Sequence, residues 1–72
     1  MHNIIMIPVS SSNVDSVGYD EATETLKVRF LNGSEYIYMN VPIMEYEGLL
    51  KAPSVGSYLN RNIKGTYNYQ KV

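Results

Sequence analysis

The sequence predicts an α+β fold, in which an antiparallel sheet of three or four strands is followed by two helices that pack on one face of the sheet. Two observations predict this order. Apolar and polar residues alternate between Val14 and Val41, as in half-buried strands, whereas after Val41 apolar residues recur at helical spacing. A chain of 72 residues has room for one thin core, so residues 1–72 should form a single domain.

The hairpin signal Asn32-Gly33 predicts the central pair of strands, because these residues readily take the positive φ angles that a tight turn needs. The signal lies between two alternating runs. Thr25–Leu31 and Ser34–Asn40 should therefore pair antiparallel.

Two more strands are expected before this hairpin. Val14–Asp20 alternates in the same way and should be connected to the hairpin by a turn over Asp20–Glu24. A short strand over Ile4–Val9 is also expected. Pro8 would confine it to a sheet edge or to a strand end, because proline has no N–H to donate.

The first helix should begin with Pro42 at the first helical position, where a missing N–H costs nothing. Its apolar face would consist of Ile43, Tyr46, Leu49 and Leu50. Ala52-Pro53 should end it, since proline cannot continue a helix.

The second helix should run from Ser54, a good N-cap, to Gly65, which suits the left-handed conformation at a helix end. Its apolar face would consist of Val55, Leu59 and Ile63, which are four positions apart. The expected core combines this face with the sheet and the first helix: Val17, Leu26, Val28, Phe30, Val41, Ile43, Leu50, Leu59 and Ile63.

The start of the second helix is a candidate anion site. Residues 54–57 (Ser-Val-Gly-Ser) offer backbone N–H groups, hydroxyls and a glycine at the positive end of a helix dipole. Ser57, Arg61 and Lys64 follow at spacings that would place them on one polar face. The candidate phosphate-binding residues are Ser54, Gly56, Ser57, Asn60, Arg61 and Lys64. The alternative is a capped helix with an ordinary solvated face.

Tyr36 and Tyr38 have two interpretations that depend on strand register. With a two-residue loop, Arg29 faces Tyr36 and Lys27 faces Tyr38, which would form a basic surface for stacking bases. If Gly33 forms a bulge, apolar residues face both tyrosines and the tyrosines join the core. We favour the second register, because small domains use tyrosine as a large packing residue.

Two later tyrosines, Tyr67 and Tyr69, could stack on a base or close the sheet edge, and we favour the edge.

Acidic and basic residues are distributed unevenly along the chain. All seven carboxylates precede residue 48, while residues 51–72 hold Lys51, Arg61, Lys64 and Lys71 and no acid. With a net charge of −1, only a small basic patch remains, which favours a single small anion over a long nucleic acid.

Catalysis is not expected. The histidine His2 lies near the chain start, and the carboxylates show no paired spacing on a predicted element. The chain has no cysteine and no metal-ligand or nucleotide-loop motif, so we expect no cofactor and no metal. No apolar run approaches the roughly 20 residues of a membrane span, so we expect a cytoplasmic protein without a membrane partner.

Several positions together form a recognisable pattern: Val17-Gly18-Tyr19-Asp20, Leu26, Val28, Phe30, Gly33, Tyr36-Ile37-Tyr38, Val41-Pro42, Ser54, Gly56, Tyr58, Asn60, Ile63 and Tyr67. The pattern resembles the KTSC domain over Val9–Val72, a family named for its occurrence at the C-terminus of some lysyl-tRNA synthetases. The resemblance implies a small α+β module, often standing alone in bacterial and phage proteins, with RNA binding suggested and no settled function. Ile37 departs from the family, in which the position between the two tyrosines more often holds a polar residue. The exposed face of this strand should therefore be more hydrophobic than in the family.

These observations predict a non-catalytic binding module. The first hypothesis is that a standalone phage or bacterial protein captures a small nucleotide or another phosphate-bearing ligand, which needs one anion site and one or two aromatic faces. A homo-oligomer could share that site between subunits. The alternatives are a module that binds single-stranded RNA or tRNA, and a protein-protein adaptor that uses either the acidic strands or the surface of Met39, Ile43 and Met44.

Overall fold

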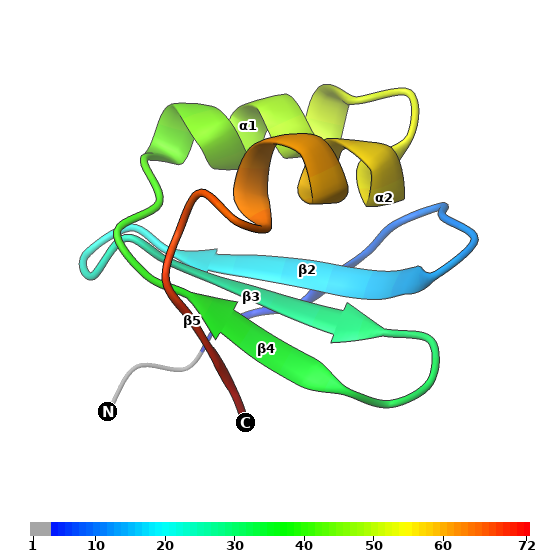
Figure 1. The fold of residues 1–72 in the computed structure, drawn as a ribbon, viewed down its shortest axis with the longest axis horizontal. Coiled ribbons are helices and arrows are strands. Elements are labelled where there is room, and N and C mark those ends of the chain that lie inside the picture. Colours follow the sequence, from blue (N-terminus) through cyan, green and yellow to red (C-terminus); the bar gives the residue numbers. More distant parts are fainter. Residues whose placement is uncertain (1–3) are drawn as a thin grey trace.

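The computed structural model describes residues 4–72, which form one antiparallel sheet with helices on a single face (Figure 1). His2 lies outside the described residues. The five strands are adjacent in chain order and comprise β1 (Ile7–Pro8), β2 (Val14–Asp20), β3 (Thr25–Phe30), β4 (Glu35–Tyr38) and β5 (Tyr69–Lys71). The helical elements are α1 (Ile43–Lys51), α2 (Val55–Tyr58) and the π-helical turn η1 (Leu59–Ile63). The predicted α+β class is confirmed, with a slightly higher strand count than three or four.

The β3–β4 hairpin is closed by a turn that ends in a left-handed glycine. The Gly33 N–H donates to the Phe30 carbonyl at 2.9 Å, the Phe30 N–H donates to the Ser34 carbonyl at 2.8 Å, and Gly33 has a φ of 92°. This geometry is typical of a hairpin with a bulge at its last loop residue. Val28 therefore lies opposite Tyr36, which confirms the bulged register. The two-residue loop is wrong.

Strand β2 contains an extra residue, which changes the direction of its side chains. Val14 lies opposite Phe30, but Ser16 lies opposite Arg29, so Asp15 is inserted between two registers. Such a bulge interrupts the alternation of a strand. As a result Val14 and Val17 both lie fully buried in the core, although they are three positions apart and a regular strand would place them on opposite faces.

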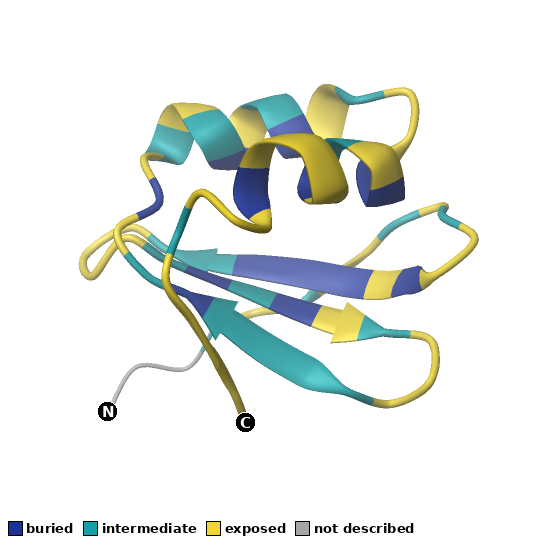
Figure 2. Ribbon diagram, in the orientation of Figure 1, coloured by how far each residue is buried: buried dark blue, intermediate teal, exposed yellow. Residues whose placement is uncertain are grey.

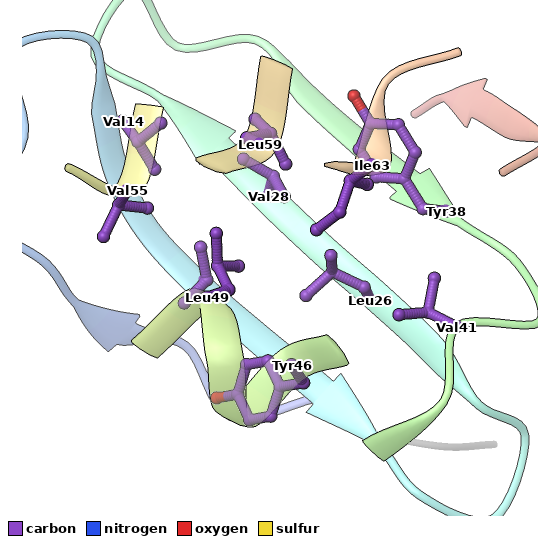
Figure 3. Close-up of a cluster of buried hydrophobic side chains, with 11 residues drawn as sticks. Val14, Leu26, Val28, Tyr38, Val41, Tyr46, Leu49, Val55, Leu59 and Ile63 are labelled. Atoms are coloured by element: carbon purple, nitrogen blue, oxygen red, sulfur yellow. The ribbon is translucent and has the colours of Figure 1, made fainter. Parts of the chain in front are cut away.

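The core lies between the sheet and the helices (Figures 2 and 3). It contains Val14, Val17, Leu26, Val28, Tyr38, Val41, Tyr46, Leu49, Val55, Leu59 and Ile63. Most of the predicted core is confirmed, while Phe30 and Ile43 pack against it half-buried. Leu50 is wrong, because it lies in the last turn of α1 and is 40% exposed, whereas its neighbour Leu49 is fully buried.

The helices differ from the sequence prediction at two points. Pro42 is the N-cap of α1 and not its first helical residue, with an extended ψ of 151°. Ser54 caps α2 as predicted and accepts a hydrogen bond from the Ser57 N–H at 3.3 Å. The α-helical turn ends at Tyr58, however, and η1 continues with the wider i→i+5 bond that the Lys64 N–H donates to the Leu59 carbonyl at 2.8 Å.

One carboxylate joins α1 to the chain on both sides of η1. The hydroxyl of Tyr58 donates to Oε1 of Glu45 at 2.5 Å, and the hydroxyl of Tyr67 donates to Oε2 at 2.9 Å. Hydrogen bonds to a charged group are stronger than neutral ones. Glu45 therefore holds α1, α2 and the approach to β5 in one arrangement.

We expect Glu45→Ala to lower the free energy of unfolding by about 1–3 kcal/mol, because two tyrosine hydroxyls lose their charged acceptor. Urea denaturation followed by circular dichroism measures this change. Glu47→Ala is the matched control on the same helix, and as an exposed position it should change stability by less than about 0.5 kcal/mol. Equal effects of the two substitutions would contradict the role of Glu45.

Stability should also fall at alkaline pH. Several tyrosines have a pKa above the ordinary value of 10.0: Tyr19, Tyr38 and Tyr46 through burial, Tyr67 through burial and its bond to Glu45, and Tyr58 first through its bond to Glu45. Their contribution is complete below pH 10, where both states are protonated. It is lost above pH 10, because the unfolded chain releases these protons first.

The measurement is the free energy of unfolding from urea denaturation at pH values on both sides of 10. We expect a level profile just below pH 10 and a decline above it, with a smaller decline in Tyr67→Phe. A free energy of unfolding that does not change across pH 10 would disprove this linkage.

Candidate functional site

A hollow of about 800 Å³ lies at the end of the sheet, between the β3–β4 loop, the turn after η1 and strand β5. This volume is within the range of small-molecule sites, about 300–1,000 Å³. We call it the aromatic groove, and its lining residues are Ser12, Asn13, Phe30, Leu31, Asn32, Ser34, Tyr36, Tyr38, Lys64, Gly65 and Tyr69.

Four aromatic rings form the floor of the aromatic groove. The Phe30 ring meets Tyr36 edge-on with centroids 5.7 Å apart, and Tyr69 lies 5.8 Å from both Tyr36 and Tyr38. Register explains the cluster, because Tyr38 is opposite Leu26 in β3 and opposite Tyr69 in β5. Tyr69 is 60% exposed, so one ring remains open to a planar ligand.

Tyr36 and Tyr38 contribute differently to the site. Tyr38 is a core residue with 2% of its surface exposed, and burial raises the pKa of its hydroxyl above the ordinary value. The hydroxyl therefore stays protonated at neutral pH and remains a donor. Tyr36 is half-buried and faces the groove.

Lys64 brings a positive charge to the aromatic groove. Its Nζ lies 5.1 Å from the centroid of the Phe30 ring, a distance that suits a cation–π contact. Within residues 4–72 the ion pairs involve Glu35 on the opposite face of the sheet, and no carboxylate lines the groove. The ammonium of Lys64 is therefore available to an anion.

The polar rim of the groove consists of donors. The side-chain oxygen of Asn32 accepts from the Ser34 N–H at 2.9 Å, and that of Asn13 accepts from the Ser11 hydroxyl at 3.2 Å. Each amide therefore keeps its NH₂ group for another acceptor. A rim of NH₂ groups and hydroxyls without a carboxylate favours a ligand that is rich in acceptors.

A second hollow of about 280 Å³ lies at the start of α2 and contains Ser54, Ser57 and Arg61. Ser54 already accepts the Ser57 N–H, and α2 has four residues, so its dipole is small. Gly56 is buried, and a Cβ there would lie 2.5 Å from the side-chain oxygen of Asn13. Glycine at this position therefore leaves space for the side chain of Asn13 and not for a phosphate.

The candidate residues predicted from the sequence are therefore divided. Ser54, Ser57 and Arg61 line the second hollow, Lys64 lines the aromatic groove, and Asn60 lines neither. The reason is η1, because its wider turn removes the regular α-helical spacing on which the predicted shared face depended.

The two later tyrosines also separate. Tyr69 closes the sheet edge in β5, as the favoured interpretation predicted, and also lines the aromatic groove. Tyr67 is held by Glu45 and does not line the groove.

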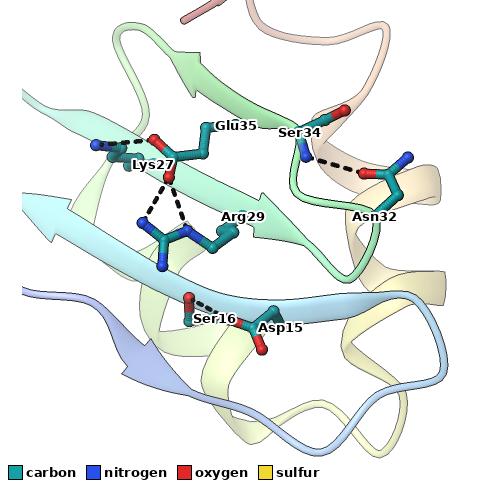
Figure 4. A network of polar contacts seen from close by, with 7 residues as sticks. All are labelled: Asp15, Ser16, Lys27, Arg29, Asn32, Ser34 and Glu35. Atoms are coloured by element: carbon teal, nitrogen blue, oxygen red, sulfur yellow. Dashed lines mark hydrogen bonds and ion pairs between the residues drawn. The ribbon is translucent and has the colours of Figure 1, made fainter.

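The opposite face of the sheet does not form the basic aromatic surface that the other register would have produced. Arg29 donates through Nε to Glu35 at 2.7 Å and also contacts it through its terminal nitrogen, and Lys27 lies 3.3 Å from the same carboxylate (Figure 4). These bonds, that of Arg29 first, lower the pKa of Glu35. Both cations are thus paired with one carboxylate, which offsets one of their two positive charges.

The polar rim of the aromatic groove was not predicted from the sequence. Ser12 and Asn13 precede β2, and Asn32 and Ser34 belong to the hairpin loop. Runs of serine and asparagine read as ordinary loops. Their grouping depends on the hairpin folding back toward the β1–β2 connection, where the Leu31 N–H donates to the Asn13 carbonyl at 2.9 Å.

Within residues 4–72 no group of three or more His, Cys, Asp or Glu side chains is arranged to hold a metal ion. In the same part of the chain no helix has the length and apolar character required to cross a membrane.

The surface predicted for a protein-protein adaptor is only partly exposed. Met44 is 76% exposed, whereas Met39 and Ile43 are half-buried.

Comparison with known proteins gives relatives of two kinds. A protein from Tsukamurella paurometabola is 41% identical over 59 residues, which cover 82% of this chain and 88% of that protein. A lysine--tRNA ligase from Trichormus variabilis is 33% identical over 75 residues, which cover 100% of this chain and 13% of the ligase. The chain therefore corresponds to a small part of the ligase.

A solved structure and a family profile agree with these relatives. The crystal structure of a KTSC domain protein from Yersinia pestis has a TM-score of 0.91 and 32% sequence identity, and the match covers 97% of this chain and 99% of that one. The profile of the KTSC domain matches residues 10–67. Since this match spans most of the sequence, and the fold and the relatives agree with it, the chain belongs to the KTSC domain family.

Proposed function

We propose that this KTSC domain is a non-catalytic module that captures a small nucleotide or another phosphate-bearing ligand in the aromatic groove. The observation that carries the proposal is Lys64, a lysine placed over a cluster of aromatic rings in a hollow without a carboxylate. A nucleotide combines a planar base with an anion, and these are the two groups that such a site attracts.

Each part of a nucleotide has a counterpart in the groove. The open ring of Tyr69 offers a stacking surface for a base, worth about 1–3 kcal/mol in comparable sites. Lys64 supplies a charge for the phosphate. The NH₂ groups of Asn13 and Asn32 can donate to phosphate or base oxygens.

The second hollow is the weaker of the two positions for a phosphate. Arg61 is its cation, and Ser54 and Ser57 supply hydroxyls. It contains Tyr58, but the hydroxyl of that residue is held by Glu45. The hollow is also smaller than most sites for small molecules, at about 280 Å³.

Single-stranded RNA is the second candidate ligand, because one relative is a lysine--tRNA ligase that contains a homologous region. The charge distribution opposes tight binding of a long strand. The basic residues of the C-terminal segment lie on separate elements, with Lys51 in α1, Arg61 in η1 and Lys71 in β5. An extended backbone needs a continuous row of cations, whereas one nucleotide needs a single site.

We expect mono-, di- or cyclic nucleotides to raise the melting temperature of the purified protein in a thermal-shift screen that includes a short single-stranded RNA. A ligand at 100 times its Kd adds about 2.7 kcal/mol of stability, which is several degrees for a domain of this size. A shift with RNA alone would favour the RNA-binding alternative. The absence of any shift would overturn nucleotide capture and favour the adaptor.

Substitutions then locate the site. We expect Lys64→Ala to weaken nucleotide binding about tenfold to a hundredfold in titration calorimetry, because a charge-assisted contact worth about 1.5–3 kcal/mol is lost. Arg61→Ala is the matched control, an exposed cation near Lys64 in the sequence that lies outside the aromatic groove. Loss of binding in Arg61→Ala with retention in Lys64→Ala would place the ligand in the second hollow.

A further inference from the structure

Both edge strands of the sheet are short, but they differ in the backbone donors that they offer to another chain. At one edge, β1 has only two residues, and one of them is Pro8, which cannot donate a ladder hydrogen bond. At the other edge, all three residues of β5 are exposed (Figure 2). The β5 edge has no hydrogen-bonded neighbour beyond it within the described residues, 4–72.

The register of β5 shows which of its backbone groups face outward. The Met39 N–H donates to the Asn68 carbonyl, and the Val72 N–H donates to the Glu35 carbonyl, both at 2.9 Å. Antiparallel ladders alternate between bonded and non-bonded pairs. Asn68, Gln70 and Val72 therefore direct their backbone groups toward β4. The N–H and C=O groups of Tyr69 and Lys71 point to the free edge.

We propose that two copies of this chain pair antiparallel along their β5 edges, with Gln70 on the two-fold axis. The outward groups of Tyr69 then bond to those of Lys71 of the partner subunit, and symmetry repeats the pair on the other side. The interface is isologous, because one edge serves both subunits and closes as a dimer. The inference does not depend on nucleotide capture.

The side chains in this register complement one another. Tyr69 and Lys71 project from the same face of β5, since residues two apart in a strand share a face. In the dimer each Lys71 lies opposite a tyrosine ring and not opposite a second lysine, an arrangement suited to a cation–π contact. Tyr69, which is 60% exposed in the single chain, becomes partly covered, on the side that faces away from β4.

The pairing also changes the aromatic groove, because Tyr69 forms part of its lining. The partner subunit's Lys71 would bring a second cation to the side of Tyr69 that faces away from β4. Each groove would then have Lys64 of its own chain inside it and the partner subunit's Lys71 at its outer border, beyond Tyr69. The dimer thus places one groove on each side of the two-fold axis.

Sedimentation velocity at increasing concentration tests the pairing. We expect the wild-type mass to approach twice the 8.2 kDa of the chain. Lys71→Pro should remain monomeric, because it removes an outward N–H and leaves the bonds to β4 intact. Lys71→Ala retains that N–H and should still dimerise, with circular dichroism confirming that both variants fold. A monomeric wild type, or dimers of Lys71→Pro, would overturn the proposal.

Disulfide trapping tests the register. Residues on the two-fold axis of this pairing form a non-bonded pair with Cα atoms about 4.5 Å apart, which is within disulfide range. The natural chain has no cysteine, so a single substitution is unambiguous. Gln70→Cys should form a disulfide dimer faster than Ala22→Cys, an exposed control in the β2–β3 turn. Equal rates would exclude pairing centred on Gln70.

Discussion

The left-handed conformation of Gly33 is the constraint on which the rest of the structure depends. It adds a residue to the β3–β4 turn and so decides which face of the sheet each residue of β4 occupies. With this register Tyr36 and Tyr38 lie on the helix-covered face, and Glu35 meets Lys27 and Arg29 on the other face. A shift by one residue would exchange the two faces.

The helical layer adds a second constraint through the change from α2 to η1. The wider turn keeps Leu59 and Ile63 buried against the sheet, yet it separates Lys64 from the polar side of the preceding turn and brings it over Phe30. The carboxylate of Glu45 stabilises this arrangement from α1 through the hydroxyls of Tyr58 and Tyr67. The position of the cation in the groove thus follows from packing that is remote from the groove.

Membership of the KTSC family establishes the fold and leaves the ligand to physical argument, because a fold can serve many functions. The groove has features of a ligand site: concave shape, aromatic walls, a rim of donors and one cation. Its placement beside β5 connects ligand binding with dimer formation, since the edge that offers Tyr69 to a ligand also offers its backbone to a second strand. Ligand and partner would therefore meet at the same tyrosine.

Local propensity and hydrophobic period were enough to predict the fold class, the strands around Asn32-Gly33, the cap at Ser54 and most of the core. They could not predict the bulge at Asp15, the π turn or the burial of Leu49 in place of Leu50, because these features satisfy packing between distant segments. Lys64 and the tyrosines Tyr36, Tyr38 and Tyr69 were candidate residues predicted from the sequence, whereas their grouping with Asn13 and Asn32 was not predicted. That grouping required the tertiary structure, because residues far apart in the sequence meet only when the hairpin, the β1–β2 connection and the end of η1 converge.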